Sequence, residues 1–123
     1  MITAIERPVA SGKGRSITLW TLSGLVALAF LAAASAKLAG ATAMVEEFNR
    51  VGLGQWFRYF TAALEVAGGI GLLLPRYAFY AAVLLASVMV GALIAHAIVL
   101  GGSPAAALVL LVLSGSIAYL RKP

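Results

Sequence analysis

Four long apolar segments make up most of the chain, and short stretches of polar residues, Gly and Pro separate them. A helix that crosses a lipid bilayer needs about 20 mostly apolar residues to span a hydrocarbon core of roughly 30 Å. Every backbone N–H and C=O group must be hydrogen-bonded within hydrocarbon, so each segment is expected to be helical. The pattern therefore predicts four membrane-spanning helices, at about residues 17–39, 56–74, 77–99 and 104–120.

The connections between these spans predict the topology. Pro75 and Arg76 leave only a tight turn between the second and third spans, and residues 101–104 separate the third from the fourth. Short connections place consecutive helices side by side in opposite directions. We therefore predict an all-α membrane protein whose domain, residues 17–120, is an antiparallel four-transmembrane-helix bundle. The predicted tails are residues 1–16 and 121–123.

The connection between the first two spans is longer and has a helical pattern of its own. Met44, Phe48 and Val51 fall on one helical face, opposite the acidic residues Glu46 and Glu47. A helix with one apolar and one charged face is typical of the membrane interface. We therefore predict a short amphipathic interfacial helix between the first and second spans.

Small residues at every fourth position predict how the spans pack, because they let helix backbones approach closely in lipid. The fourth span has no such stripe, so we expect it to lie more peripherally. The stripes are Ala32, Ala36 and Gly40; Ala63, Ala67 and Gly71; and Ser87, Gly91 and Ala95.

The composition fits a membrane protein and excludes several functions. Hydrophobic residues make up 63% of the chain and charged residues 11%, whereas soluble proteins carry about 25% charged residues. The net charge of +5 comes from basic residues scattered singly, so nucleic-acid binding is not expected. The absence of Cys excludes thiolate chemistry and iron–sulfur ligation, and a single His leaves too few ligands for a transition-metal site.

The distribution of Lys and Arg predicts the orientation, since basic residues are enriched in cytoplasmic loops. Six lie on the side that carries both predicted tails, and three lie on the other side. Both termini are therefore expected in the cytoplasm. The competing interpretation is a signal peptide cleaved near Ala34-Ser35-Ala36, which would leave three spans and an external N-terminus. The six are Arg7, Lys13, Arg15, Arg76, Arg121 and Lys122, and the three are Lys37, Arg50 and Arg58.

Five polar residues within or near the spans are the candidate ligand-binding residues: Lys37, Arg58, Thr61, Glu65 and His96. Glu65 lies nine residues into its span, roughly 13 Å deep, where a carboxylate needs a partner. Helical side chains lean toward the N-terminus of their helix, so Glu65 and Lys37 lean toward each other on antiparallel neighbours. We predict a direct or water-bridged contact between them.

The same residues also have structural interpretations. Lys37 and Arg58 sit near span ends, where long basic side chains commonly extend to the headgroups. His96 fits an interfacial histidine bound to water. A purely structural ion pair of Glu65 with Lys37 competes with the functional interpretation.

Two motifs resemble those of the DoxX family of small four-span bacterial inner-membrane proteins. Ala34-Ser35-Ala36-Lys37-Leu38 resembles its S-x-K-L stretch, and residues 65–74 (EVAGGIGLLL) resemble its E-x-x-G-G-x-x-L-L-L segment, with His96 also fitting the pattern. The resemblance covers about residues 17–120. It implies a four-helix bundle in the inner membrane and, from the family's namesake in a thiosulfate:quinone oxidoreductase, association with membrane oxidoreductases. Relatives that supply electrons use Cys pairs, which this chain lacks.

Two functions follow from the resemblance and the polar residues. One is a membrane subunit or accessory of an oxidoreductase system with a quinone- or lipid-sized pocket in the outer half of the bundle, supplied with electrons by a partner. The other is a non-catalytic membrane module that binds a lipid-like ligand or stabilises a larger assembly. Both favour a protein partner or a homo-oligomer over a stand-alone enzyme, and neither requires a covalent cofactor.

The topology gives a first prediction. The wild-type chain has no Cys, so the single variants Ala10→Cys and Lys122→Cys can be labelled without background. In intact cells both cysteines should be shielded from an impermeant thiol reagent and react only after permeabilisation. Opposite sidedness of the two positions, or loss of the first forty residues from the mature protein, would contradict the four-span topology.

Overall fold

A computed structural model describes the backbone of residues 2–123 and the side chains of residues 14–123. All regular structure in this part of the chain is helical, which confirms the all-α prediction. Met1 and the side chains of Arg7 and Lys13, which contributed to the predicted tail and its charge, lie outside the described residues. The elements are α1 (Ile2–Ala39), α2 (Thr42–Val51), α3 (Trp56–Leu72), α4 (Ala78–Ala95), the π-helix η1 (His96–Leu100) and α5 (Ala105–Arg121).

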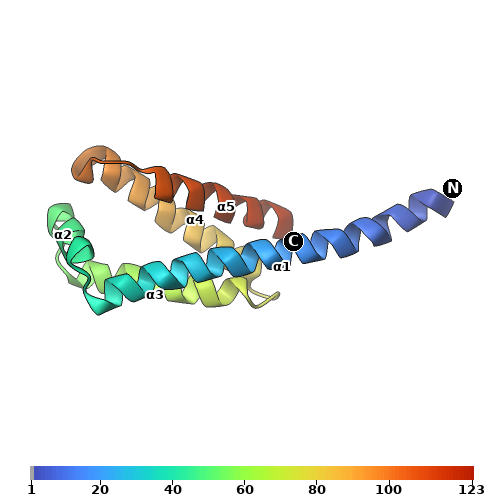
Figure 1. The fold of residues 1–123 in the computed structure, drawn as a ribbon, viewed down its shortest axis with the longest axis horizontal. Coiled ribbons are helices and arrows are strands. Elements are labelled where there is room, and N and C mark those ends of the chain that lie inside the picture. Colours follow the sequence, from blue (N-terminus) through green and yellow to red (C-terminus); the bar gives the residue numbers. More distant parts are fainter. Residues whose placement is uncertain (1) are drawn as a thin grey trace.

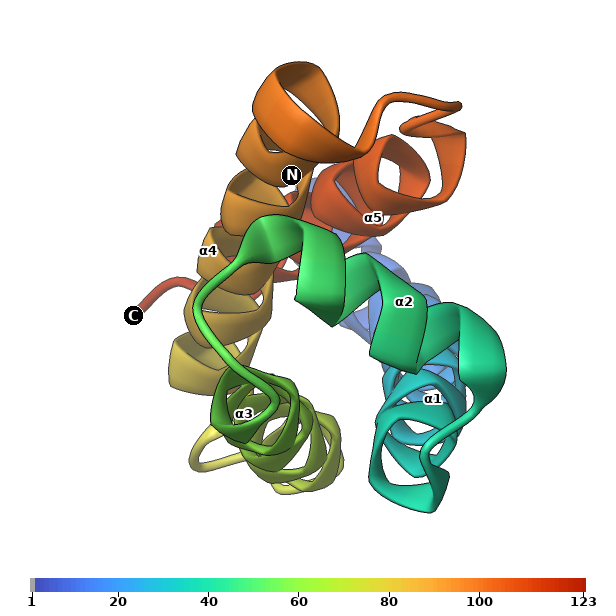
Figure 2. The same ribbon diagram turned by 90° about the vertical axis from the view of Figure 1, so that its left-hand side faces the viewer.

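The four long helices lie along the length of the molecule, and α2 crosses one end of them (Figure 1). The chain follows α1 to the end where α2 lies, returns along α3, passes back along α4 and returns along α5. Viewed along the length of the molecule, α2 crosses in front, and α1, α3, α4 and α5 run back behind it (Figure 2). Helix α1 contacts α3 and α5, and α4 contacts α3 and α5, so the four helices enclose a common interior.

Except at the start of the first span, the helix boundaries follow the breaks predicted from the sequence with small shifts. Helix α3 ends at Leu72 because the next residues form a turn before Pro75, in which the Leu74 N–H bonds to the Gly71 carbonyl at 3.1 Å. Helix α4 continues into η1 and ends at Gly101, whose φ is +64°. Helix α1 has no break at the start of the predicted first span, residue 17.

Two helical segments of the described chain are long and apolar enough to cross a membrane, Gly14–Ala39 and Ala78–Leu100. Ala105–Arg121 is a shorter apolar helix, and α3 has 17 residues. A 17-residue helix is about 25 Å long, at the lower end of the range for spanning helices.

The predicted short helix between the first two spans is present as α2. Its apolar face turns inward, with Phe48 buried and Met44 half-buried, while Glu46 is exposed. The helix lies between left-handed glycines, Gly40 with φ +72° and Gly52 with φ +83°. Glycine adopts this backbone region without a Cβ clash, so each provides a sharp change of chain direction.

The core lies along the facing sides of the four long helices. Buried positions recur every third or fourth residue, as expected for helices packed side by side. The largest fully buried side chains include Phe30 of α1, Leu72 of α3, Leu85 of α4 and Ile117 of α5. Large apolar side chains such as Leu28, Ile98 and Val112 point outward, and a bilayer would cover this surface.

The closest approach of α3 to α4 occurs at two glycines. A Cβ built on Gly71 would lie 2.7 Å from the Cβ of Ala81, and one built on Gly68 would lie 2.5 Å from the Leu85 side chain. Gly69 faces α1 in the same way, since a Cβ built on it would lie 3.0 Å from the Leu31 side chain. These contacts fasten the end of the molecule at which α3 turns into α4.

The packing predicted from the stripes of small residues is wrong in two respects. Most stripe members face outward. On α3 the stripe member Gly71 does meet α4, but the other close contacts are made by Gly68 and Gly69, which lie outside the stripe. The fourth predicted span, α5, is not peripheral, since it packs against both α1 and α4 and buries Ser114 and Ile117. The exposed stripe members are Ala32, Ala63, Ala67, Ser87 and Gly91.

The glycine contacts give a stability prediction. Gly71→Ala should lower the stability of the detergent-solubilised protein by about 1–3 kcal/mol, the usual effect of overpacking, because the Cβ of Ala81 cannot rotate away. Gly115→Ala in α5 is the matched control, since nothing lies within 4 Å of its added Cβ. Thermal unfolding followed by circular dichroism would measure both, and equal melting temperatures would contradict the assigned contact.

Candidate functional site

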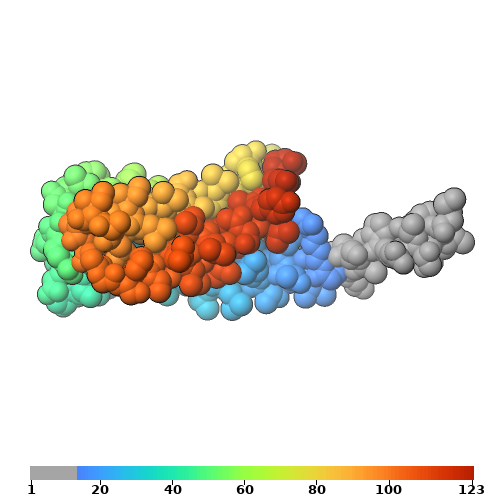
Figure 3. Space-filling view, turned by 90° about the horizontal axis from the view of Figure 1, so that it is seen from above, coloured from blue at the N-terminus to red at the C-terminus, as the bar shows by residue number. Residues whose placement is uncertain are grey.

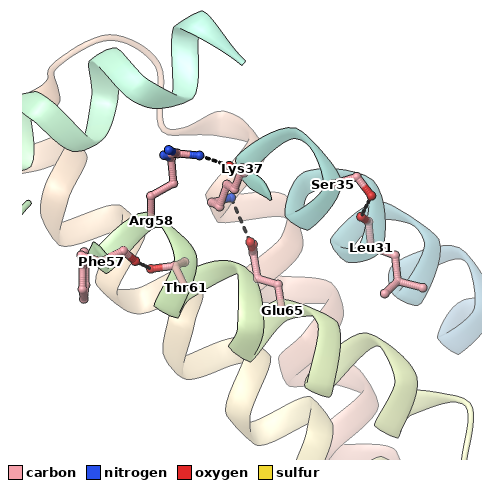
Figure 4. A network of polar contacts seen from close by, with 7 residues as sticks. All are labelled: Leu31, Ser35, Lys37, Phe57, Arg58, Thr61 and Glu65. Carbon is pink, nitrogen blue, oxygen red and sulfur yellow. Dashed lines mark hydrogen bonds and ion pairs between the residues drawn. The ribbon is translucent and has the colours of Figure 1, made fainter. Parts of the chain in front are cut away.

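An ion pair between Lys37 and Glu65 joins α1 to α3 (Figure 4). The Lys37 Nζ lies 2.9 Å from the Glu65 Oε1, which confirms the contact predicted from the opposed lean of the two side chains. The Glu65 side chain is 2% exposed and that of Lys37 13% exposed. A carboxylate this deeply buried needs the nearby ammonium, since an unpaired charge in an apolar interior costs several kcal/mol.

The close packing of α1 on α3 positions this pair. Gly69 lies one helical turn beyond Glu65 and lets Leu31 of α1 approach the α3 backbone. Lys37 is two residues from the end of α1, where its side chain can lean back along the helix toward Glu65. The glycine contact and the ion pair thus lie on the same face of α3.

Arg58 is buried and fastens the start of α3 to the end of α1. One Nη donates to the carbonyl oxygen of Lys37, its Nε donates to the Gln55 Oε1 at 2.8 Å, and the guanidinium lies 4.4 Å from the centre of the Tyr59 ring. Backbone carbonyls in the last turn of a helix lack helical partners, so Arg58 supplies a donor at the end of α1. The predicted candidate Arg58 therefore has a structural task and does not line the cavity described next.

The other four predicted residues, Lys37, Thr61, Glu65 and His96, line one cavity of about 400 Å³. It lies between α3 and α4 at the end of the molecule that α2 covers. The walls are mostly apolar and come from these two helices, and Phe48 and Val51 of α2 close the end. Cavities of this size with few polar groups are typical of small-molecule sites.

The polar groups of the cavity differ in how many of their hydrogen-bonding positions the protein itself already uses. The Thr61 Oγ1 donates to the Phe57 carbonyl one turn earlier, at 2.9 Å. The Lys37 ammonium has three N–H groups, and Glu65 is its one partner among residues 14–123. The His96 Nδ1 lies 3.0 Å from the Gly101 carbonyl oxygen, which can only accept, so Nδ1 carries a proton and Nε2 is free to bind a ligand.

The local backbone explains the position of His96. It begins η1, and the Gly101 N–H bonds back to its carbonyl at 3.0 Å in the i→i+5 pattern of a π-helix. The same turn brings the Gly101 carbonyl to the imidazole. Single π-helical turns of this kind occur frequently at functional sites.

The cavity has an opening on the side of the molecule, between α3 and α4. Three of its lining residues, Phe60, Ser87 and Gly91, are exposed, whereas Glu65 and Met89 are buried at its inner end. The two helices are tightly packed at Gly68 and Gly71 and separate toward the α2 end. In a bilayer this opening would face lipid.

Two residues of the site were missed by sequence reasoning. Gln55 accepts from Arg58 and donates to the Asn49 Oδ1 at 2.8 Å and the Val45 carbonyl at 3.1 Å, so it ties α2 to α3. In the sequence, Gln55 lies between two glycines and the aromatic start of α3, and nothing in that position indicates this role. Glu47, placed on the outer polar face of α2, is half-buried and lines the cavity.

Among residues 14–123, no three His, Asp or Glu side chains come together, so this part of the chain offers no cluster of metal ligands. The cavity can instead hold an apolar body and bind one polar head at its inner end. The Lys37 N–H groups could donate to an acceptor on that head, and the His96 Nε2 could accept from a hydroxyl.

Comparison with known proteins supports the resemblance noted in the motifs. The model of the DoxX-like family matches residues 21–119, which include the second half of α1, all of α3 and α4, most of α5 and every candidate residue. No curated protein and no solved structure gives a significant match to the chain. The family match and the apolar helices together indicate a membrane protein.

The buried ion pair gives a prediction for a double-mutant cycle. Glu65→Gln and Lys37→Met should each lower the free energy of unfolding by about 3–5 kcal/mol, because each leaves one buried polar partner without its counterpart. The double variant should be more stable than the sum of the two losses predicts. Unfolding of the four proteins in mixed micelles measures the coupling. Strictly additive losses would show that the two groups do not interact.

Proposed function

The chain belongs to the DoxX-like family, and we propose that it is a four-span protein of the plasma membrane whose cavity binds the head of a quinone. In this proposal both termini lie in the cytoplasm, and α2 lies in the outer interface. The protein serves as a membrane subunit or accessory of an oxidoreductase system. The observation that carries the proposal is an apolar-walled cavity with a buried ion pair at its inner end.

The four crossings are supported by the arrangement of the helices. The two segments that satisfy the length and hydropathy requirements, Gly14–Ala39 and Ala78–Leu100, lie alongside α3 and α5. Helices of similar length that pack side by side lie in the same solvent. Because Gly14–Ala39 and Ala78–Leu100 cross the bilayer in this proposal, α3 and α5 cross it as well. The charged residues of α3 do not oppose this, because Arg58 and Glu65 are buried against partners inside the bundle.

The chemistry of the cavity suits a quinone. A quinone has two carbonyl oxygens on a flat ring and an apolar tail, so it requires a donor at the inner end of an apolar cleft. The Lys37 ammonium is such a donor, and the lateral opening at Phe60 and Gly91 leaves a path for the tail into lipid. Glu65 holds the ammonium in place, and its carboxyl group lies near the ring, which must take up protons when it takes up electrons.

The electrons for quinone reduction would come from a partner protein. The chain has no Cys, and the described residues contain no cluster of metal ligands. The motif resemblance to the DoxX family, whose namesake acts with a quinone, supports association with a membrane oxidoreductase. The protein is accordingly a binding subunit that works with a partner.

A lipid-binding module is the second candidate, and one observation favours it. Lys37 and Glu65 already neutralise each other, so the cavity suits a neutral or zwitterionic headgroup as well as a carbonyl. In that case the opening between α3 and α4 would hold an acyl chain, and the protein would stabilise a larger assembly without taking part in electron transfer.

Extraction of bound molecules distinguishes the two candidates. Protein purified in mild detergent should release a prenylated quinone, detected by mass spectrometry, in near-equimolar amount. The variant Glu65→Gln with Lys37→Met should retain at least about tenfold less, since it removes the polar contacts at the head. Gly91→Phe should also lose the quinone, because the new ring would fill the opening. The ring has room there, since nothing lies within 4 Å of a Cβ built on Gly91.

Gly115→Phe is the control for Gly91→Phe, since Gly115 is an α5 glycine with equal space and lies outside the cavity. Its quinone content should match that of the wild type. Phospholipid without quinone in the wild-type extract would favour the lipid-binding module. Full quinone retention by a well-folded double variant would overturn the role of the ion pair.

A further inference from the structure

A second polar site lies at the opposite end of the molecule from α2. Arg15 of α1 and Arg121 of α5 line a small cavity of about 180 Å³ together with Ser16, Leu19 and Trp20. The space-filling view shows the C-terminal end of α5 lying beside α1 where the described side chains begin (Figure 3). An Nη of Arg15 donates to the Leu120 carbonyl, so the two arginines are held at one junction between the helices.

No acidic side chain of residues 14–123 balances the positive charge of this junction. Glu46 and Glu47 belong to α2 at the far end, and Glu65 is paired with Lys37. No carboxylate among residues 14–123 lies within 4 Å of either arginine, and the Nε of Arg121 is buried without a hydrogen-bond partner there. Two guanidinium groups beside a cavity, with donors to spare, are suited to an anionic oxygen ligand.

The apolar surroundings indicate what kind of anion this is. The Arg121 guanidinium lies 5.2 Å from the centre of the Trp20 ring, and that ring is 41% exposed. Ile17 is 64% exposed on the same helix. Tryptophan beside arginine at a helix end is characteristic of the membrane–water interface, where an acyl chain can lie on the exposed apolar surface.

We propose that Arg15 and Arg121 form a site for the phosphate of an anionic phospholipid at the end of the bundle opposite α2. The guanidinium N–H groups donate to the phosphate oxygens, the Ser16 hydroxyl can add a donor, and Trp20 packs against the glycerol and upper acyl region. Basic pockets between membrane helices recognise anionic headgroups in this way. The site is separate from the ligand cavity and needs only that the helices lie in a bilayer.

The test compares two double variants that remove the same amount of charge. Arg15→Gln with Arg121→Gln removes the proposed site. Arg76→Gln with Lys122→Gln removes two charges from the same end of the helix bundle, and neither residue lines this cavity. Native mass spectrometry of purified full-length protein, titrated with phosphatidylglycerol or phosphatidylcholine, measures the affinity for each lipid.

Wild-type protein and the Arg76/Lys122 variant should bind phosphatidylglycerol more tightly than phosphatidylcholine. The Arg15/Arg121 variant should bind phosphatidylglycerol about tenfold more weakly and lose this preference. If that variant does not fold, Arg15→Lys with Arg121→Lys replaces it. It keeps the charge but loses the planar fork, and should show a reduced preference.

Three outcomes would overturn the proposal. Equal affinity of the wild type for the two lipids would show that the site does not select an anion. Equal losses in the two charge-matched variants would show attraction by net charge without a site. Competition by inorganic phosphate at the same concentration as the lipid would assign the site to a free anion and not to a headgroup.

Discussion

The structure depends on the pairing of a buried carboxylate with an ammonium inside an apolar bundle. Glu65 is almost fully enclosed, and its position fixes the side of α3 that must face α1. Once α3 has this rotation, Gly69 meets Leu31 of α1, and Gly68 and Gly71 meet α4. A rotation of α3 that exposed Glu65 to lipid would lose the ion pair and replace these glycine contacts with bulkier neighbours. The pair thus gives a mostly apolar, weakly patterned helix one preferred orientation.

Much of the fold was predictable because membrane solvation imposes strong rules on a sequence. Long apolar segments must be helical, and Pro75 and the glycines near residue 101 mark turns that few other residues would allow. The Lys37–Glu65 contact was also predictable, since helix geometry gives the lean of both side chains and an isolated carboxylate needs a partner. The amphipathic pattern also placed Phe48 on the apolar face of α2, and this residue is buried.

The packing faces and part of the site were not predictable for physical reasons. In a chain rich in Ala and Gly, several small-residue stripes compete, and the choice between them depends on contacts with a second helix that sequence spacing does not contain. Arg58 resembles a cavity residue in sequence, yet its long side chain reaches back to the end of α1. The roles of Gln55 and Glu47 depend on how α2 folds over α3, and this is set by glycine turns on both sides of α2.

The close contact of α3 with α4 at Gly68 and Gly71 has a consequence for evolution at the other end of these helices. The two helices pack tightly near the turn that joins them and lie farther apart where the cavity is. In such a diverging pair, a change of a few tenths of an ångström at the tightly packed end alters the angle between the helices, and the displacement grows with distance along them. Relatives could therefore change the width of the cavity by exchanging Gly for Ala at the turn, while every residue that lines the cavity stays the same.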